Sequence, residues 1–213
     1  MKAKAPLMGR QLLYPSGLAG RMTGAVMDIA NRTPTRLALD LLAPRDGERV
    51  LDAGCGTGAV SRELLRRAAC DIDGVDWSPA MLHRAQVRLG LSLHNEQSPR
   101  VNLHLAHLSS LPFPPGQFDA VLALNILYFC DNDGAMLREL RRMLRPGGRL
   151  VAYVTDRSTM QGWAFVRHGT HRLFDRHEVT QALIAGGFAP EDICVMPCAI
   201  TRRINGILVR ATV

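Results

Sequence analysis

A run of seven residues, Asp52-Ala53-Gly54-Cys55-Gly56-Thr57-Gly58, most strongly limits what this chain can fold into. It follows a short apolar strand candidate, residues 49–53, and leads into a helical pattern over residues 58–69. Its glycines lack the Cβ atoms that would block a tight turn and keep a ligand away from the backbone. The pattern therefore predicts the first strand, loop and helix of an α/β fold, with a ligand at the loop.

The spacing of these glycines favours one kind of ligand over another. Dinucleotide-binding loops read G-x-G-x-x-G and seat a pyrophosphate at the helix N-terminus. This chain reads G-x-G-x-G and places Asp52 two residues before the first glycine, where a carboxylate repels a pyrophosphate and attracts an ammonium group. A second acid, Asp76, ends the next strand candidate and is placed to accept the hydroxyl groups of a ribose. The pattern disfavours an NAD-dependent enzyme and indicates an adenosine ligand with a cationic part.

Strand and helix candidates alternate along the rest of the chain. The expected strands are residues 49–53, 71–76, 101–105, 118–124 and 149–155, and the expected helices are residues 34–42, 58–69, 79–89, 133–144 and 178–185. Two segments, 90–100 and 145–148, are expected as a loop and a turn, and residues 192–200 and 204–212 as an antiparallel hairpin. This order predicts an α/β fold with a doubly wound, mostly parallel sheet. Residues 1–33 are predicted to form an N-terminal helical cap segment, and residues 34–213 the ligand-binding domain.

Composition limits the class of protein further. No apolar run reaches the roughly 20 residues needed to cross a bilayer, and the basic N-terminus lacks the apolar stretch of a secretory signal. Five cysteines without metal-type spacing predict small buried residues in a reducing cytoplasm and no metal site. The formal net charge of +7 favours an anionic small molecule or an acidic membrane surface as partner, although a solvated basic surface is the simpler interpretation.

Over roughly residues 35–213 the chain resembles the class I S-adenosylmethionine-dependent methyltransferases, in particular the small-molecule and ubiquinone/menaquinone-type branch. The resemblance rests on the loop 52–58, the strand end at Asp76, and the segments 106–113 and 124–129. It implies a Rossmann-like, seven-stranded sheet, S-adenosylmethionine as cofactor with S-adenosylhomocysteine as product, and in-line displacement at the sulfonium. The acceptor is expected to be a small or lipid-like molecule. The Asn-Pro-Pro-aromatic motif of enzymes that methylate adenine is absent, so no nucleic acid partner is expected.

The resemblance also implies roles for residues at the carboxyl ends of the strands. Asp52 would attract the cofactor ammonium, Asp76 would bind both ribose hydroxyls, and the carbonyl of Asn125 would accept from the ammonium. His107 stands where relatives carry an aspartate that accepts from the adenine amino group, and only a neutral imidazole could accept that bond. The complete set predicted to bind the cofactor is Asp52, Ala53, Gly54, Cys55, Gly56, Gly58, Asp76, Trp77, Met81, His107, Leu108 and Asn125.

Residues that contact the acceptor are expected outside the cofactor loops. One candidate segment is the N-terminal one, and the other is 156–174, where Arg157, Arg167 and Arg172 stand among aromatic residues and could hold an anionic group. A general base is needed only if the acceptor must lose a proton. The candidates for that base are Tyr14, Tyr128, His168 and His171.

One alternative from another class remains open at this stage. A non-catalytic, regulatory module could bind S-adenosylmethionine without a usable acceptor pocket. An enclosed pocket beside Asn125 would favour the enzyme, and a filled one would favour the module. The identity of the acceptor, the atom that is methylated and the oligomeric state do not follow from the sequence.

Overall fold

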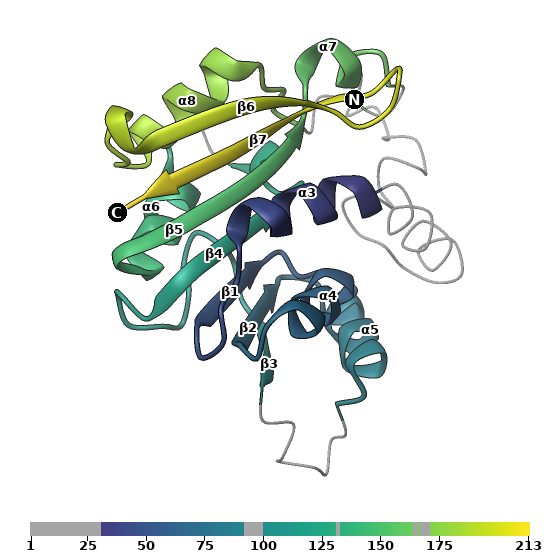
Figure 1. Ribbon diagram of the computed structural model, residues 1–213, viewed down its shortest axis with the longest axis vertical. Helices are drawn as coiled ribbons and strands as arrows, with labels where there is room; N and C mark the ends of the chain where they lie inside the picture. The colour runs from purple at the N-terminus through teal and green to yellow at the C-terminus, as the bar shows by residue number, and fades with distance from the viewer. Residues whose placement is uncertain (1–30, 92–99, 131–132, 164–165, 167–170) are drawn as a thin grey trace, which may run out of the picture.

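The computed structural model describes residues 31–91, 100–130, 133–163, 166 and 171–213 (Figure 1). The strands are β1 (Arg49–Ala53), β2 (Asp71–Asp76), β3 (Val101–Leu105), β4 (Phe118–Leu124), β5 (Leu144–Thr155), β6 (Ile193–Ala199) and β7 (Asn205–Thr212). The α-helices are α3 (Arg32–Leu42), α4 (Ala59–Arg67), α5 (Pro79–Leu89), α6 (Ala135–Met143), α7 (Arg157–Met160) and α8 (Arg176–Ala185). Two short 3-10 helices are η1 (Leu127–Phe129) and η3 (Pro190–Asp192).

The seven strands form one sheet in the order β3-β2-β1-β4-β5-β7-β6. Strands β1 to β5 pair in parallel, and β7 pairs antiparallel with both β5 and β6. The first strand, β1, lies in the middle of the sheet. From there the chain moves outward to β3 and then returns to β4 beside β1. Ligands in open α/β sheets bind at such a switch point, outside the carboxyl ends of the strands. The predicted doubly wound sheet with a terminal hairpin is confirmed.

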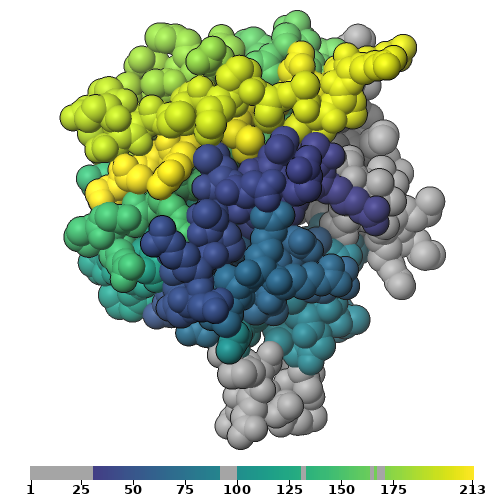
Figure 2. All heavy atoms as spheres, in the orientation of Figure 1, coloured from purple at the N-terminus to yellow at the C-terminus, as the bar shows by residue number. Residues whose placement is uncertain are grey.

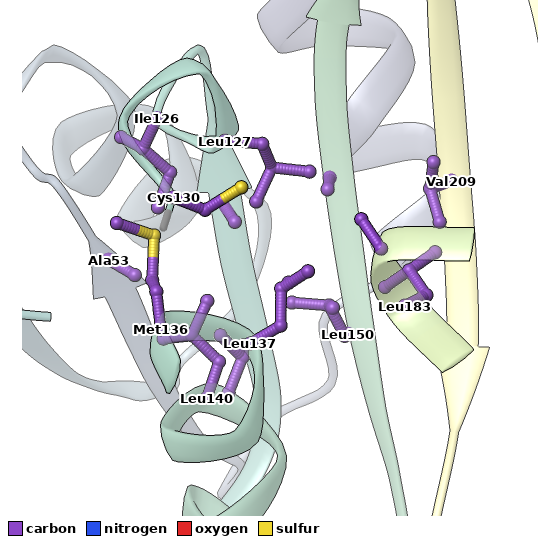
Figure 3. Packing of buried hydrophobic residues seen from close by; sticks show 14 of the residues in the cluster. Ala53, Ile126, Leu127, Cys130, Met136, Leu137, Leu140, Leu150, Leu183 and Val209 are labelled. Atoms are coloured by element: carbon purple, nitrogen blue, oxygen red, sulfur yellow. The ribbon is translucent and has the colours of Figure 1, made fainter. Parts of the chain in front are cut away.

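Helices cover both faces of the sheet (Figure 1). Alternate residues of a strand point to opposite faces, so Val50 of β1 joins one apolar core and Leu51 joins the other. Figure 3 shows the second core, where Leu137 and Leu140 of α6 pack toward Leu150 of β5. Because both faces are buried, the central strands read as nearly continuous apolar runs. The helix residues buried in the first core include Leu39, Leu42 and Leu64, and those in the second include Leu137, Leu140 and Leu183.

The predicted turn at residues 145–148 is instead a bulge within β5. The pairing of β4 with β5 passes from Leu144 directly to Arg149, so the intervening residues loop out of the register. Gly147 adopts a φ of +76°, and its N–H donates to the carbonyl of Val213 at the end of the chain. Leu144, which was predicted to end the preceding helix, therefore begins β5. An apolar residue at this point fits either element, so the sequence pattern could not distinguish them.

One helix was not predicted, and the start of another differs from the prediction. Helix α7 follows β5 where no helix was expected, and Asp156 caps it by accepting from the N–H of Ser158 at 2.8 Å. Helix α3 begins at Arg32 rather than at Pro34, which stands inside its first turn. The predicted cap segment, residues 1–33, lies outside the described residues except for its last three, so it stays a prediction.

Candidate functional site

The glycine loop folds back over the end of β2. The N–H groups of Gly54 and Cys55 both donate to the carbonyl oxygen of Val75, at 2.8 and 2.9 Å. Gly54 has a φ of +74°, and a Cβ atom there would lie 2.4 Å from Cγ2 of Ile126, just beyond β4. Glycine is therefore required at this position by both conformation and space, and the loop packs against the ends of β2 and β4 together.

Three other residues of the loop differ in what surrounds them. Ala53 ends β1 with its side chain in the core under α6 and α8. Gly58 is the N-cap of α4, and a Cβ atom there would lie 3.0 Å from that of Ala85 in α5. A Cβ atom at Gly56 would meet nothing closer than 3.9 Å. Packing therefore explains why Ala53 and Gly58 are small, whereas Gly56 leaves room for a ligand against the backbone.

Asp76 ties the glycine loop to the end of β2 through both of its carboxylate oxygens. Oδ2 accepts from the N–H of Gly56 at 3.0 Å, and Oδ1 accepts from the N–H of Ser78 at 2.8 Å. Asp76 is only 8% exposed, and this burial raises the pKa of its carboxyl in spite of the backbone donors. Each oxygen keeps acceptor capacity for a further donor. The carboxylate can therefore take two ribose hydroxyls without releasing the loop.

A second carboxylate, Asp52, is buried behind the loop. Its Oδ2 accepts a hydrogen bond of 2.6 Å from the hydroxyl of Ser61 in the first turn of α4. Burial, with added repulsion from Asp76, raises the pKa of Asp52 to about 6 despite this bond. A nearby cation would favour the ionised form of both acids. Burial likewise raises the pKa of the Cys55 thiol, which stays protonated at neutral pH.

Two exposed rings meet beyond the ends of β2 and β3. Trp77 is 42% exposed, and its ring centroid lies 6.1 Å from that of His107. The N–H of Ala106 donates to the carbonyl of Asp76 at 3.2 Å, which holds the segment after β3 beside the acid. Flat exposed side chains next to the acid that is predicted to bind a ribose fit a nucleobase. The remaining predicted contacts on this side, both half-buried, are Met81 and Leu108.

Asn125 follows β4 in a left-handed conformation, with a φ of +58°. Its N–H donates to the carbonyl of Tyr153 at 3.0 Å. Its Nδ2 donates to Oδ1 of Asn31 at 3.1 Å, and its Oδ1 accepts from the hydroxyl of Tyr128 at 3.1 Å. The backbone carbonyl oxygen of Asn125 accepts no hydrogen bond from the described part of the chain. That oxygen is therefore available for the predicted contact with an ammonium group.

The candidate bases differ in their surroundings. Tyr128 is buried, its hydroxyl oxygen accepts from the N–H of Thr155, and burial raises its pKa, so this hydroxyl is a poor base near neutral pH. The His171 ring centroid lies 5.0 Å from that of Phe129, and burial lowers its pKa, so its imidazole is neutral and can accept a proton. The two candidates that lie outside the described residues are Tyr14 and His168.

Arg157, one of the arginines predicted to hold an anionic acceptor, is already paired. Its guanidinium forms a bidentate ion pair with Glu178 of α8, and its Nη2 also donates to the carbonyl of Leu173 at 3.2 Å. Glu178 in turn completes a capping box with Asp175 at the start of α8. Arg157 therefore joins α7 to α8, and binding an external anion would break that contact.

Arg172 is the better placed arginine among the described residues. Its N–H donates to the carbonyl of Tyr128 at 2.9 Å, which holds it beside η1 at the end of β4. Its guanidinium lies 4.9 Å from the ring centroid of Phe174 and forms no ion pair with the described residues. The third predicted arginine, Arg167, lies outside the described residues.

Three residues that support this site were not predicted from the sequence. Ser61 could have been found, because it stands in the first turn of the helix that follows Asp52 and its loop. Asn31 is 94 residues from its partner Asn125, and no sequence signal connects them. Thr155 takes part through its backbone N–H, which carries no signal of side-chain type.

The remaining features bear on metals, membranes and pockets. In the described ranges no group of three or more His, Cys, Asp or Glu side chains could hold a metal ion. None of the helices in the described part is long and apolar enough to cross a membrane. A shallow hollow of about 270 Å³ lies between the start of α7 and the β6–β7 hairpin. Asn125 is not in its lining, so this hollow does not distinguish an enzyme from a binding module.

Comparison with known proteins shows what this chain is similar to. Residues 50–148 match the family described as "Methyltransferase domain". Malonyl-[acyl-carrier protein] O-methyltransferase of Halorhodospira halophila is 32% identical over 168 residues, covering 76% of this chain and 54% of that protein. Demethylmenaquinone methyltransferase of Tropheryma whipplei is 38% identical over 116 residues, covering 54% of this chain and 45% of that protein. A structure of Haemonchus contortus phosphoethanolamine N-methyltransferase 2 with S-adenosylhomocysteine has a TM-score of 0.70 at 18% identity. The similarity covers 85% of this chain and 53% of that one.

The sheet order, the glycine loop and the acid that ends β2 define a Rossmann-like domain built to bind a nucleoside cofactor. With the family match over residues 50–148, this part of the chain is a methyltransferase domain of the class I, S-adenosylmethionine-dependent type, and S-adenosylmethionine is its cofactor. This confirms the predicted family, fold class and cofactor. The chain spans about half the length of the curated relatives it matches.

Proposed function

We propose that this protein transfers the methyl group of S-adenosylmethionine to a small-molecule or lipid-like acceptor that carries an anionic group. The observation that carries the proposal is the pair of buried carboxylates, Asp52 and Asp76, around a glycine loop, because it suits an ammonium group and a ribose and opposes a phosphate. The relatives named above are methyltransferases whose names specify malonyl-[acyl-carrier protein] and demethylmenaquinone. Those names support catalysis over the non-catalytic module, and an acceptor of this general kind.

In this proposal the protein acts by binding and orienting two reactants. The cofactor supplies a methyl group on a sulfonium, which is already an activated leaving group. Asp76 would hold the ribose, and Trp77 and His107 would cover the adenine. The carbonyl of Asn125 would accept from the ammonium, and Asp52 would attract it by charge. Alignment of the acceptor with the methyl group is then the main contribution to the rate.

His171 is the proposed general base for an acceptor that must lose a proton. The lowered pKa keeps its imidazole neutral, and its ring lies beside Phe129 at the end of β4. Tyr128 is set aside for this role because its hydroxyl is buried and engaged on both sides. The roles of Tyr14 and His168 stay predictions from the sequence.

S-adenosylmethionine and S-adenosylhomocysteine are expected to raise the midpoint of thermal unfolding, whereas NAD is not. A ligand that binds only the native state stabilises it by about 2.7 kcal/mol at 100 times its dissociation constant. For a domain of this size that corresponds to a shift of about 5–10 °C. Differential scanning fluorimetry with each compound measures the shift, and a shift with NAD alone would overturn the assignment.

Arg172→Gln is expected to raise KM for an anionic acceptor about tenfold while cofactor affinity stays unchanged. The reason is the loss of a charge-assisted hydrogen bond to the acceptor. Methyl transfer to a panel of carboxylated and phosphorylated small molecules, with matched uncharged analogues, measures the effect. The control is Arg157→Gln, which removes the Glu178 ion pair and should lower stability without changing KM. Turnover of uncharged analogues alone would contradict an anionic acceptor.

We also propose that the protein acts in the reducing cytoplasm. All five cysteines are free thiols in the structure, which fits a compartment where disulfides do not form. The net charge of +7 leaves an acidic membrane surface open as the source of a lipid-like acceptor. No nucleic acid substrate is proposed.

A further inference from the structure

A chain of hydrogen bonds runs from the end of β5 across η1 to the start of α3. The N–H of Thr155 donates to the hydroxyl of Tyr128, which donates to Oδ1 of Asn125. The Nδ2 of Asn125 then donates to Oδ1 of Asn31 at 3.1 Å. The tyrosine hydroxyl accepts from the backbone N–H through its oxygen and donates its one proton to the amide oxygen of Asn125. The amide nitrogen of Asn125 is thereby left to donate to Asn31.

These bonds act on a residue whose backbone is in an unfavourable conformation. Asn125 has a φ of +58°, a left-handed conformation that side-chain-bearing residues adopt rarely, with asparagine among the more tolerant. Its side-chain amide is held at both ends, by Tyr128 and Asn31, and its N–H is held by the carbonyl of Tyr153. The one polar group of Asn125 that no described residue engages is its backbone carbonyl oxygen.

The chain of bonds also connects parts of the molecule that meet at the cofactor loop. Ile126, next to Asn125, packs where a side chain on Gly54 would otherwise lie. Asn31 immediately precedes α3, which lies between the β6–β7 hairpin and α4 on the surface of the molecule (Figure 2). Neither Tyr128 nor Asn31 needs to touch a ligand in order to control how the end of β4 faces the glycine loop.

We propose that Tyr128 and Asn31 are positioning residues of the active site, which act through Asn125 and aim its carbonyl at the cofactor ammonium. The inference rests on the proposed cofactor contact of Asn125. When either side-chain partner is lost, Asn125 is free to relax from its left-handed conformation. The carbonyl then turns away from the ligand although no ligand-contacting residue has changed.

The test compares Tyr128→Phe, Asn31→Ala and the double variant by calorimetric titration with S-adenosylhomocysteine. Each single variant is expected to raise the dissociation constant about tenfold, the effect of one lost hydrogen bond. The double variant is expected to be little weaker than either single variant, because both act through the same residue. Asn31→Asp keeps an oxygen acceptor for Nδ2 of Asn125, so it should restore affinity to within about twofold.

Thr180→Val is the control, since it also removes a hydroxyl that donates a hydrogen bond, but to the carbonyl of Arg176 within α8, which is not part of the chain of bonds. It should leave affinity unchanged whatever it does to the midpoint of thermal unfolding. Wild-type affinity in both Tyr128→Phe and Asn31→Ala would overturn the positioning role, as would independent, multiplicative losses. Failure of the wild-type protein to bind S-adenosylhomocysteine would instead overturn the cofactor contact itself. Asn31 is only partly buried, so Asn31→Ala keeps the test decisive if Tyr128→Phe does not fold.

Discussion

Asp76→Ala is expected to weaken the binding of S-adenosylhomocysteine about a hundredfold or more while the protein stays folded. The substitution removes an ionised acceptor for two ribose hydroxyls, and one hydrogen bond to a charged group contributes about 1.5–3 kcal/mol. It also leaves the N–H groups of Gly56 and Ser78 without their partner. Part of this loss of stability is offset. Burial raises the pKa of Asp76, so ionising it in the folded protein costs free energy, and alanine removes that cost. Calorimetric titration and thermal unfolding measure the two effects separately.

Asp73→Ala is the matched control on the same strand. Asp73 is buried like Asp76, but its oxygens are bonded to Nε of Arg49 at 2.9 Å and to Nε2 of His104 at 2.8 Å. Burial raises its pKa, but these two partners outweigh burial and hold the pKa below its ordinary value. We expect Asp73→Ala to lower stability strongly and leave cofactor affinity nearly unchanged. The same loss of affinity in both variants would show that Asp76 acts only through the fold.

Asp52→Asn is expected to make the protein more stable at pH 7 and a weaker binder of the cofactor. The pKa of Asp52 is about 6 in the folded protein and has an ordinary value of 3.8. Its contribution to stability is therefore fully present below about pH 4 and is lost as the pH rises through about 6. At pH 7 the buried, ionised carboxylate therefore lowers the free energy of unfolding by about 3 kcal/mol relative to its value below pH 4. Asparagine keeps an oxygen for the Ser61 hydroxyl and has no charge to bury.

The cofactor affinity of the wild-type protein should change with pH in the opposite sense. The cofactor ammonium favours the ionised carboxylate, so affinity should rise about tenfold between pH 5 and pH 7, with release of a proton below pH 6. In Asp52→Asn this part of the pH dependence should disappear. Calorimetry in buffers of different ionisation enthalpy counts the protons released. Identical pH profiles in the two proteins would exclude Asp52 as the group that responds to the ammonium.

Much of the fold followed from local pattern. The glycine loop after an apolar strand, the acid that ends the next strand and the alternation of elements all predicted the doubly wound sheet, which the structure confirms. The pattern failed at residues 145–148, which bulge from β5 opposite a single residue of β4 instead of forming a turn before the strand. A bulge depends on how neighbouring strands register with each other, and that is not a property of either strand alone.

The cofactor side of the candidate site could be predicted for the same reason. Gly54, Gly56 and Asp76 take their positions from a turn and a strand end, so their spacing along the chain already describes their arrangement in space. The acceptor side could not. Arg157 was predicted to bind an anion, but in the structure its guanidinium is paired with Glu178 from a separate helix.

Residues close together along the chain were enough to predict the class of fold and to propose the chemistry at the glycine loop. The tertiary structure alone decided which side chains are already engaged. It paired the hydroxyl of Tyr128 with Thr155 and brought Asn31 to Asn125 across 94 residues. The physical reason is that burial and long-range hydrogen bonding depend on how helices pack on the sheet, and this packing decides whether a polar group meets a partner, a ligand or water.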